Sequence, residues 1–290
     1  MQIAFLGSPT SWYLADLRRA AGDRHSVVPV TYRQLCSHVD QSKVSLHSGE
    51  VDLRRCDVLL VRSMPPGSLE QVIFRMNALA TLETAGVRVI NSPRAIEVAV
   101  DKYLTTVRLQ QAGLLVPKTI ACQTTEQAMQ HFETLGADVV VKPLFGGEGR
   151  GITRVSDEAI ALRTFKALEQ IGAVIYLQEF IEHEGHDLRI FVLGDQLLGM
   201  RRRHPTDWRT NISRGAIAEP LEITPQLADL AHQATAATGA TLAGIDLLPG
   251  KDGKLYVLEV NAVPGWRALA KSTQTDVAVK ILIWLEQSTL

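Results

Sequence analysis

The segment from residue 243 to residue 261 constrains the fold and the chemistry of this chain more than any other. It holds two apolar, β-rich runs, AGIDLL (243–248) and LYVLEVN (255–261), joined by the turn-forming PGKDG (249–253). Two such runs around a short Pro/Gly/Asp connection predict a β-hairpin. Glu259 and Asn261 are two residues apart in the second run, so their side chains point to the same face.

Carboxylates lie in both strands of this predicted hairpin. With the turn centred near residues 251 and 252, Asp246 lies opposite Val257 and diagonal to Glu259, at a separation of about 7–8 Å. Two acids and an amide in apolar strands lose hydration at a cost unless they bind something, and oxygen ligands of this kind suit Mg²⁺ or Mn²⁺. The hairpin alone leaves a second interpretation open, a polar pair on a solvated sheet face.

Composition narrows the class of protein. A chain of 290 residues is long for one core, so we expect two or three small lobes. A net charge of -1 gives no basic excess, so we expect no nucleic-acid partner. The N-terminus has no signal-peptide pattern and no apolar run reaches the length of a membrane span, so we expect a cytoplasmic protein without a membrane partner. Cys36, Cys56 and Cys122 show no paired spacing, which supports neither a disulfide framework nor a zinc site.

Residues 1–92 alternate short apolar strands with helical patterns, which predicts a parallel α/β domain. Ser92 and Pro93 then mark a helix start, and the helical pattern continues towards residue 111, with Asp101 and Lys102 inside it. Residues 93–177 comprise this helical linker and a small α+β lobe, and residues 178–290 contain a further hairpin, a basic segment and the acidic hairpin. We therefore expect three regions, 1–92, 93–177 and 178–290.

A glycine-rich stretch lies between two strands of the middle region. FGGEGRG (145–151) follows a strand that ends at Lys142. Four glycines in seven residues give a backbone that wraps closely around an anion, and the absence of a Gly-Lys-Ser/Thr ending favours a mobile flap over phosphates rather than a helix-preceding loop. A floppy surface loop is the alternative. Lys142 ends a nearly all-apolar strand, where a lysine needs an anionic partner, whereas Lys102 by itself is typical of a solvated lysine.

Arginines gather in sequence beside the acidic hairpin. The cluster consists of Arg189, Arg201, Arg202, Arg203, Arg209 and Arg214, together with Asn211. Arginine binds phosphates and carboxylates through paired hydrogen bonds, so the cluster favours an anion site over a solvated loop. Glu179 and Asp187 are additional polar residues suited to the ribose or the base of a nucleotide.

Taken together and in this order, these motifs resemble the ATP-grasp superfamily, and within it the RimK-type ligases, which add L-glutamate to a carboxylate. The resemblance covers about residues 91–287, and residues 1–90 are similar only to a generic α/β pre-domain. The matching segments are DK (101–102) before AGxxxP, VVKP (140–143), QEFI (178–181), HDLR (186–189), WRTN (208–211) before RG (214–215), AGID (243–246) and LEVNAVPG (258–265). The implied fold is an ATP-grasp α/β fold with an N-terminal parallel pre-domain, a central lid lobe and a C-terminal lobe built on an antiparallel sheet.

The resemblance also implies roles for individual positions. Lys102 and Lys142 would bind the phosphates of ATP under a flap containing Gly146, Gly147, Gly149 and Gly151. Glu179 and the backbone of Phe180 would hold the adenine, and Asp187 would hold the ribose. Arg209 and Asn211 would contact the phosphates, and the remaining ATP contacts would come from Gln178, Ile181 and Leu258. Asp246, Glu259 and Asn261 would hold two Mg²⁺ or Mn²⁺ ions. Arg189, Arg203 and Arg214 would be catalytic, with Arg189 and Arg203 as candidates for contacts to the acyl phosphate and the incoming amino acid.

The implied activity is an ATP-dependent carboxylate–amine ligation through an acyl phosphate. The partners would be L-glutamate and an acceptor carboxylate on a small molecule or a protein C-terminus, and we expect a homo-oligomer, a dimer or a tetramer. The WRAL segment (266–269) departs from the ribosomal-protein modifiers and is more similar to ligases linked to tetrahydromethanopterin metabolism. Two alternatives stay open: an ATP-grasp ligase for another amino acid, of the lysine-biosynthesis or D-alanine–D-alanine type, and an ATP-binding module without turnover.

Overall fold

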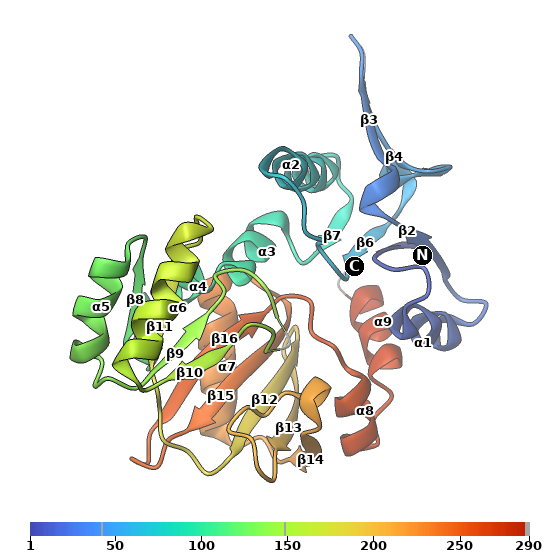
Figure 1. The fold of residues 1–290 in the computed structure, drawn as a ribbon. Helices are drawn as coiled ribbons and strands as arrows, with labels where there is room; N and C mark the ends of the chain where they lie inside the picture. Colours follow the sequence, from blue (N-terminus) through green and yellow to red (C-terminus); the bar gives the residue numbers. More distant parts are fainter. Residues whose placement is uncertain (42, 148, 288–290) are drawn as a thin grey trace.

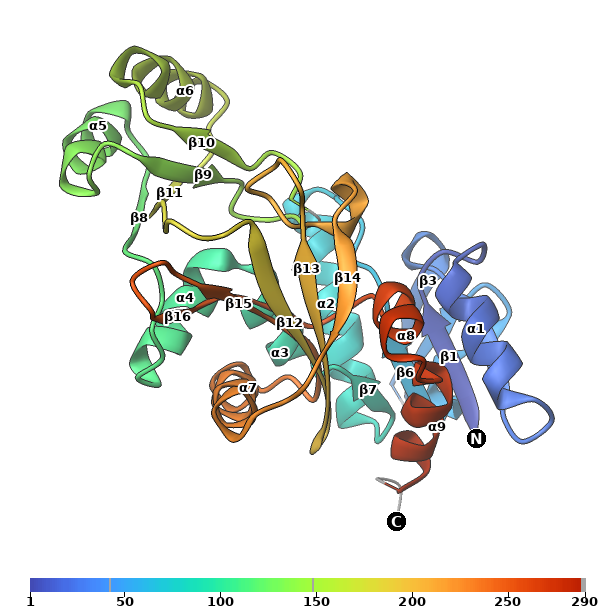
Figure 2. The same cartoon turned by 90° about the horizontal axis from the view of Figure 1, so that it is seen from below.

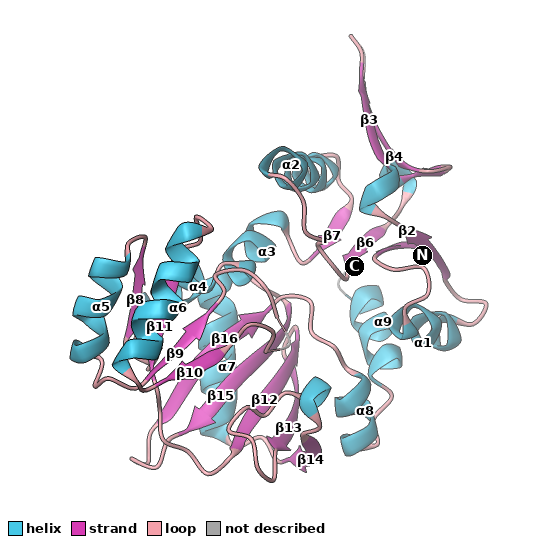
Figure 3. Cartoon of the chain, viewed as in Figure 1, coloured by secondary structure: helices cyan, strands magenta, loops and turns pink. Residues whose placement is uncertain are grey.

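The computed structural model describes residues 1–41, 43–147 and 149–287. The chain forms three regions that follow one another in sequence and lie around a central junction (Figure 1). Each region is built on its own sheet, and helices cover the sheets (Figure 3). This is the mixed α/β architecture that the sequence predicts.

The N-terminal sheet is parallel and has the order β2-β1-β6-β7. Its strands are β1 (Gln2–Leu6), β2 (Ser26–Val30), β6 (Val58–Val61) and β7 (Arg88–Ile90), and its helices are α1 (Trp12–Ala21) and α2 (Leu69–Thr84). All four residues of β6 are buried, as is typical of a central parallel strand covered on both faces. The strand order reverses between β1 and β6, and open parallel sheets bind ligands at the carboxyl ends of the strands at such a point.

A small antiparallel sheet projects from the N-terminal region as an arm (Figure 1). It consists of β3 (Leu35–Val39), β4 (Val44–Ser48) and β5 (Val51–Asp52), with the short 3₁₀ helices η1 (Tyr32–Gln34) and η2 (Leu53–Arg55) at its base. Sequence analysis missed this sheet. Most side chains of β3 are exposed, so the strand carries little of the alternating apolar pattern from which a strand is recognised.

The predicted single helix over residues 93–111 is wrong. The chain forms α3 (Pro93–Val100) and α4 (Lys102–Gln111), separated at Asp101. Asp101 has an extended backbone and accepts a hydrogen bond from the Leu104 amide at 3.0 Å. An aspartate that caps a new helix in this way ends the old one. Lys102 is therefore the first residue of α4, where the helix dipole disfavours a cation.

The central region is an antiparallel sheet with two helices on one face. Its elements are β8 (Thr119–Cys122), α5 (Thr125–Thr134), β9 (Val139–Lys142), β10 (Thr153–Val155), α6 (Glu158–Gln170) and β11 (Ile175–Glu179). The strand order is β10-β9-β11-β8, so the expected boundary at residue 177 falls inside β11. The helices pack through Phe132 and Phe165, whose ring centroids are 6.3 Å apart. The opposite face carries Val140, Lys142 and Gln178 because side chains alternate along a strand.

The C-terminal region is an antiparallel sheet in the order β14-β13-β12-β15-β16. Its elements are β12 (His186–Leu193), β13 (Gln196–Arg203), η3 (Ile212–Arg214), β14 (Ile217–Leu221), α7 (Pro225–Thr238), β15 (Leu242–Pro249), β16 (Leu255–Asn261), α8 (Arg267–Thr273) and α9 (Val277–Gln287). Helix α7 covers one face, where Ala231 joins Ile190 and Ile245 in the core. The sequence pattern predicted a strand that ends at Arg201, left Arg202 and Arg203 in a polar, basic segment, and did not reveal β14 or α8.

Asn91 joins the N-terminal region to the C-terminal sheet. Its side chain is buried, and its amide nitrogen donates to the carbonyls of Leu242, at 2.8 Å, and Ala262, at 2.6 Å. Its oxygen accepts from the backbone amides of Thr241 and Leu242. A buried amide with this many partners holds the start of β15 and the end of β16 against the parallel sheet. No helix in the described part of the chain is long and apolar enough to cross a membrane.

Candidate active site

The acidic hairpin is confirmed as β15 and β16, but its register differs from the prediction. Asp246 lies directly opposite Glu259 rather than opposite Val257. Between Asp246 and Leu247 the register shifts, so Leu258 is an extra residue on β16. Such a bulge changes the direction in which side chains point. The sequence prediction assumed a symmetric turn with regular pairing, and that assumption leaves no room for a bulge. The two carboxylate-bearing residues are consequently direct cross-strand neighbours, which lie closer together than diagonal ones.

Asp246 belongs to a buried chain of alternating charges across three strands. Arg189 on β12 donates to both carboxylate oxygens of Asp246, and one Arg202 nitrogen on β13 lies 2.9 Å from Asp246 Oδ2. Arg202 also forms a paired interaction with Asp187, at 2.7 and 2.5 Å. Burial raises the pKa of Asp246, but the two guanidiniums more than offset it and the net shift is downward. For Asp187 burial prevails over Arg202, and its pKa is raised.

Glu259 differs from Asp246 although the two face each other. Its carboxylate is half-buried and has no hydrogen bond or ion pair among the described residues. It acts electrostatically on both predicted phosphate lysines across the cleft. Burial lowers the pKa of Lys142 to about 8 and also lowers that of Lys102, with Glu259 opposing both shifts. The structure therefore brings Lys102, Lys142, Asp246 and Glu259 into one electrostatic group.

The oxygen donors of the hairpin fit a divalent cation. Within the described residues no group of three or more His, Cys, Asp and Glu side chains gathers around a common point, but the candidate set contains only two carboxylates and one amide. Glu259 offers an unpaired carboxylate, and Asn261 points to the same face with its Oδ1 accepting from the Val263 amide at 2.9 Å. Asp246 would have to be shared with Arg189 and Arg202. Hard oxygen donors of this kind suit Mg²⁺ or Mn²⁺.

The glycine flap reaches across to the loop between β13 and β14 (Figure 2). A Cβ atom on Gly149 would lie 2.3 Å from Asn211 Oδ1, so only a glycine permits this approach. Arg209 donates to the carbonyl of Ile152 at 3.4 Å, and Lys102 donates to the carbonyl of Gly146 at 2.7 Å. The described flap residues, 146, 147 and 149–151, are thus tied to both walls of the cleft.

A small cavity opens between the cleft faces of the central and C-terminal sheets. Its lining residues include Val140, Lys142, Gln178, Glu179, Phe180, Ile181 and Leu258. Lys142 donates to the Gln178 side chain, and Glu179 is held by the Lys118 amide at 2.9 Å. The Phe180 amide donates to Asp138, whereas the Ile181 amide makes no hydrogen bond within the described chain. The slot is narrow and mostly apolar, and among the residues that the structure describes the Ile181 amide is a free backbone donor beside it.

The sequence of this chain also matches a known protein family. A profile of the RimK-like ATP-grasp domain matches residues 99–285. The chain belongs to the RimK-like ATP-grasp family. Members of this family use ATP and divalent metal ions, and relatives of the chain are named ligases, so this chain is an ATP-grasp ligase.

Relatives with assigned activities span nearly the whole chain. A tetrahydromethanopterin:alpha-L-glutamate ligase from Methanosarcina acetivorans is 33% identical over 87% of this chain and 86% of its own length. The corresponding ligase of Methanococcus maripaludis is 30% identical over 97% of each chain. A glutamate–LysW ligase, ArgX, from Sulfolobus acidocaldarius is 29% identical over 82% of this chain and 84% of its own.

Solved structures support the fold. The ATP-grasp ligase PsnB in complex with a minimal precursor superimposes with a TM-score of 0.77 over 98% of both chains, at 23% identity. A second PsnB structure, which contains Mg and ADP, has a TM-score of 0.77 at 21% identity over 99% of this chain and 97% of that chain. At this level of identity the likeness concerns the fold alone.

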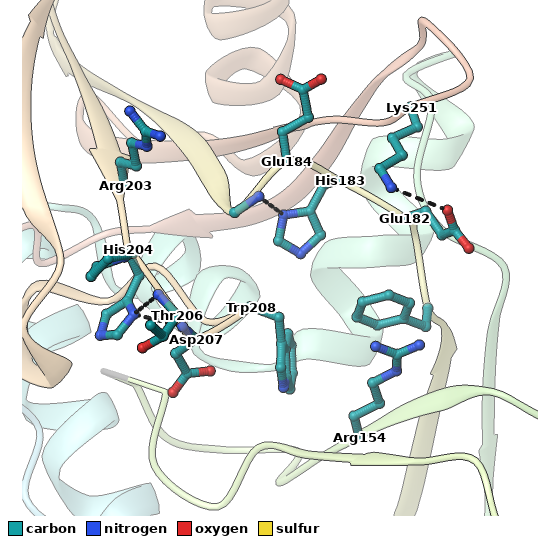
Figure 4. A pocket seen from close by; sticks show the side chains of 13 residues that line it. Arg154, Glu182, His183, Glu184, Arg203, His204, Thr206, Asp207, Trp208 and Lys251 are labelled. Atoms are coloured by element: carbon teal, nitrogen blue, oxygen red, sulfur yellow. Dashed lines mark hydrogen bonds and ion pairs between the residues drawn. The ribbon is translucent and has the colours of Figure 1, made fainter.

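A wider pocket of this RimK-like chain adjoins the slot and shares Phe180, His183 and Trp208 with it (Figure 4). It encloses about 430 Å³. The guanidinium of Arg154 lies 3.5 Å from the centroid of the Phe180 ring, and Trp208 meets the same ring edge-on at 5.7 Å. Sequence analysis assigned no role to His183 or to Arg154. Trp208 was part of a recognised motif, but nothing in the sequence indicated that it would wall a cavity.

The predicted arginines separate into distinct places. Arg189 lies in the charge chain, and Arg209 and Arg214 both contact Asp207 in the loop opposite the flap, at 3.0 and 3.4 Å. Arg203 follows Arg202 on β13 and lies outside the charge chain, but it lines the wider pocket beside the slot (Figure 4). Arg202, which sequence analysis left without a role, is the arginine that joins both buried aspartates. If the strand had been predicted to extend through residue 203, side-chain alternation would have separated Arg202 from its neighbours Arg201 and Arg203.

Proposed function

We propose that this ATP-grasp ligase couples ATP cleavage to amide formation between an acceptor carboxylate and the amino group of L-glutamate, through an acyl phosphate. The observation that carries the proposal is the convergence of Lys102 and Lys142 with Glu259 across a cleft that also contains a narrow, mostly apolar slot. Two cations and an unpaired carboxylate facing one space suit a metal-bound polyphosphate.

Each group of residues in the site has its own role in the two-step reaction. In the first step an acceptor carboxylate oxygen forms a bond to the γ-phosphorus and ADP leaves; in the second the amine forms the C–N bond and phosphate leaves. Lys102 and Lys142 hold the phosphates, and the flap excludes water from the acyl phosphate. Asp246, Glu259 and Asn261 would hold divalent cations, Mg²⁺ or Mn²⁺, which neutralise phosphate charge when bound. Arg189 lies beside this group as the donor for developing negative charge.

Asp187 acquires a different role from the one that the resemblance implied. Its two oxygens are both bound by Arg202 and its side chain is buried. We propose that it fixes Arg202, and through it Asp246, rather than contacting the ribose. The wider pocket, with His183 and Trp208, provides the alternative ribose environment.

The choice of L-glutamate and of the acceptor rests on the relatives. Two of them are named for attaching glutamate to tetrahydromethanopterin, and another is named for attaching it to LysW. We propose L-glutamate as the amine and a small cofactor carboxylate as the acceptor, with a protein carboxylate as the second candidate.

Phosphate release from ATP tests the proposal. The full chain is incubated with ATP, Mg²⁺ and a deproteinised metabolite extract, and each amino acid is added in turn. L-glutamate-dependent release, with a product heavier by one glutamyl residue, supports it. Release with another amino acid indicates a different ATP-grasp ligase, and ATP binding without any release indicates a non-catalytic module. The Lys142→Met variant is the control for contaminating ATPases.

A further inference from the structure

A buried glutamine lies in the middle of the cleft face of the central sheet. Gln178 is on β11, and only 2% of its surface is exposed. In the register of the sheet it pairs with Val140 on β9 and with Thr119 on β8. Tyr176 precedes it by two residues on the same face and pairs with Lys142. A predicted phosphate lysine and three polar side chains therefore share one patch of this face.

Hydrogen bonds within the patch fix the orientation of the Gln178 amide. Its nitrogen donates to the hydroxyls of Thr119 and Tyr176, each at 3.0 Å. The Thr119 hydroxyl donates to the Pro117 carbonyl at 2.8 Å, so it must accept from Gln178. A side-chain amide has two hydrogens, and both are used here. The amide oxygen is left to face the ammonium of Lys142, which can only donate.

The Tyr176 hydroxyl extends this network to the second phosphate lysine. It lies 2.8 Å from Thr106 Oγ1 and 3.5 Å from the carbonyl oxygen of Lys102. Burial raises the pKa of Tyr176, so the hydroxyl keeps its hydrogen at neutral pH. Lys102 begins α4, and Thr106 lies one turn further along the same helix. Gln178 is therefore joined to Lys142 directly and to the first turn of α4 through Tyr176.

The partner of Lys142 is neutral. Gln178 supplies the one hydrogen bond that the Lys142 ammonium makes in the part of the chain that the structure describes. An amide holds an ammonium in place without cancelling its charge, whereas a carboxylate there would form an ion pair with it. The next residue, Glu179, has a carboxylate, but it accepts from the Lys118 amide at 2.9 Å and lies 3.5 Å from Lys118 Nζ. The charge of Lys142 stays available for an anion in the cleft.

We propose that Gln178 is a positioning residue, which acts through Lys142 on the phosphates of ATP rather than by contact with the adenine. The inference rests on the proposed function, in which Lys142 binds phosphate, and it revises the role that the resemblance gave to Gln178. Gln178 also lines the slot, but both of its amide hydrogens are bound within the protein. Donating them to a base would break two buried hydrogen bonds.

The first experiment replaces the neutral acceptor with a carboxylate of the same size. ATP with Mg²⁺ is titrated into the native chain and into Gln178→Glu by calorimetry, and thermal unfolding of both nucleotide-free chains is compared. We expect the Kd for ATP to rise at least about tenfold, because the carboxylate competes with phosphate for Lys142. The midpoint of unfolding should not fall, since the new ion pair replaces a hydrogen bond. A Kd equal to that of the native chain overturns the proposal.

The second experiment separates an effect through Lys142 from a direct contact with the nucleotide. The Kd for ATP is measured in Gln178→Met, in Lys142→Met and in the double variant. We expect Gln178→Met to raise the Kd about tenfold in the native background and less than about twofold in the Lys142→Met background, because its effect requires the ammonium. Equal losses in the two backgrounds would show that Gln178 contacts ATP itself, and they overturn the proposal.

Thr119→Val tests the orientation of the amide by a milder change. It removes one acceptor of the Gln178 amide, and we expect the Kd for ATP to rise about threefold. Thr238→Val is the matched control, because this buried hydroxyl also donates to a backbone carbonyl, that of Ala234 at 3.0 Å, but lies in α7, outside the central region. Equal losses of ATP affinity in the two variants would assign the effect to general destabilisation and contradict the proposal.

The same measurements distinguish failure of this inference from failure of the proposed function. ATP affinity that depends on Lys142 but not on Gln178 refutes the positioning role and leaves the proposed function intact. A native chain that binds no ATP overturns both. In the ligase assay, Gln178→Glu should raise the KM for ATP and change the KM for L-glutamate by less than about twofold, because only the phosphate lysine is affected. An equal rise in both KM values contradicts the proposal.

Discussion

Two groups of buried charge in this protein are built on opposite plans. In the chain Arg189–Asp246–Arg202–Asp187, every member has at least one oppositely charged partner within hydrogen-bonding distance. Glu259 and Arg62 have no ion-pair partner among the described residues, although one faces Asp246 across the hairpin and the other contacts the segment that follows it.

The difference separates charges that the protein satisfies from charges that it leaves for ligands. Burying an ion without a counter-charge costs stability, so a fold retains such groups where a substrate or cofactor completes them. On this argument the four paired charges serve as a scaffold, and Glu259, which faces the two lysines, is left for a ligand. The charge variants below test the two sides of that division, and a flap variant tests how the cleft between them closes.

Breaking the set of paired charges should have the largest effect on the protein. Arg202→Met leaves Asp187 and Asp246 buried with too few partners, and we expect a loss of about 3–5 kcal/mol in the free energy of unfolding. Urea unfolding followed by circular dichroism measures it. Arg201→Met, at the exposed neighbouring position, should change stability by less than about 0.5 kcal/mol. Equal stability of the two variants would show that the four paired charges are not a scaffold.

Glu259→Gln removes an unpaired charge and should affect turnover rather than folding. We expect kcat to fall by at least about 100-fold, which corresponds to about 2.7 kcal/mol in the transition state. Much of the ATP affinity should persist because the lysines and the slot remain. Coupled ADP formation and nucleotide titration provide the two measurements. An unchanged kcat would refute the assignment of Glu259 as a metal ligand.

Gly149→Ala tests whether the flap must approach the loop around residue 211. Gly149 has a φ of +71°, and an added Cβ would meet Asn211. An alanine in this conformation costs about 1–2 kcal/mol, so we expect a drop of about 5- to 30-fold in the ligase rate. Gly147→Ala is the control, because nothing lies within 4 Å of its added Cβ. Similar losses in both variants would mean that flap flexibility, rather than this contact, limits the rate.

The pH dependence of ATP binding should show the smallest effect. Because burial lowers the pKa of Lys142 to about 8, the nucleotide-free protein loses this positive charge as the pH rises through that value. Phosphates bind the protonated lysine, so the Kd for ATP should rise by up to about tenfold per pH unit above about 8. Calorimetry between pH 7 and about 9.5 measures this change. A slope that persists unchanged in Lys142→Met would assign the effect to another group.

Much of the candidate site follows from local patterns. The hairpin was predictable from two apolar runs around PGKDG, and the flap from four glycines between strands. The sheets of the N-terminal, central and C-terminal regions likewise follow from runs of apolar residues whose period is visible without any tertiary information. The break at Asp101 was less visible, because an aspartate is compatible both with a helix interior and with a helix cap.

The pairings between distant residues could not be predicted in the same way. Strand alternation would place Arg202 and Arg203 on opposite faces only once β13 is known to extend through both. The bulge at Leu258 shifts the register by one residue, and one residue decides whether Asp246 faces Glu259 or Val257. Arg62 follows an ordinary buried strand, and nothing near it in the sequence indicates that its guanidinium is buried without a carboxylate partner.

By itself, the sequence determined which residue types are available, their order along the chain and most of the strands and helices that carry them, because these depend on side-chain periodicity and local capping. Only the tertiary structure decided which charges are paired. Arg202 meets two aspartates, whereas Arg62 meets two aromatic rings and two carbonyls. Electrostatic energy depends on distance and on burial, and neither quantity is a property of a residue's place in the sequence.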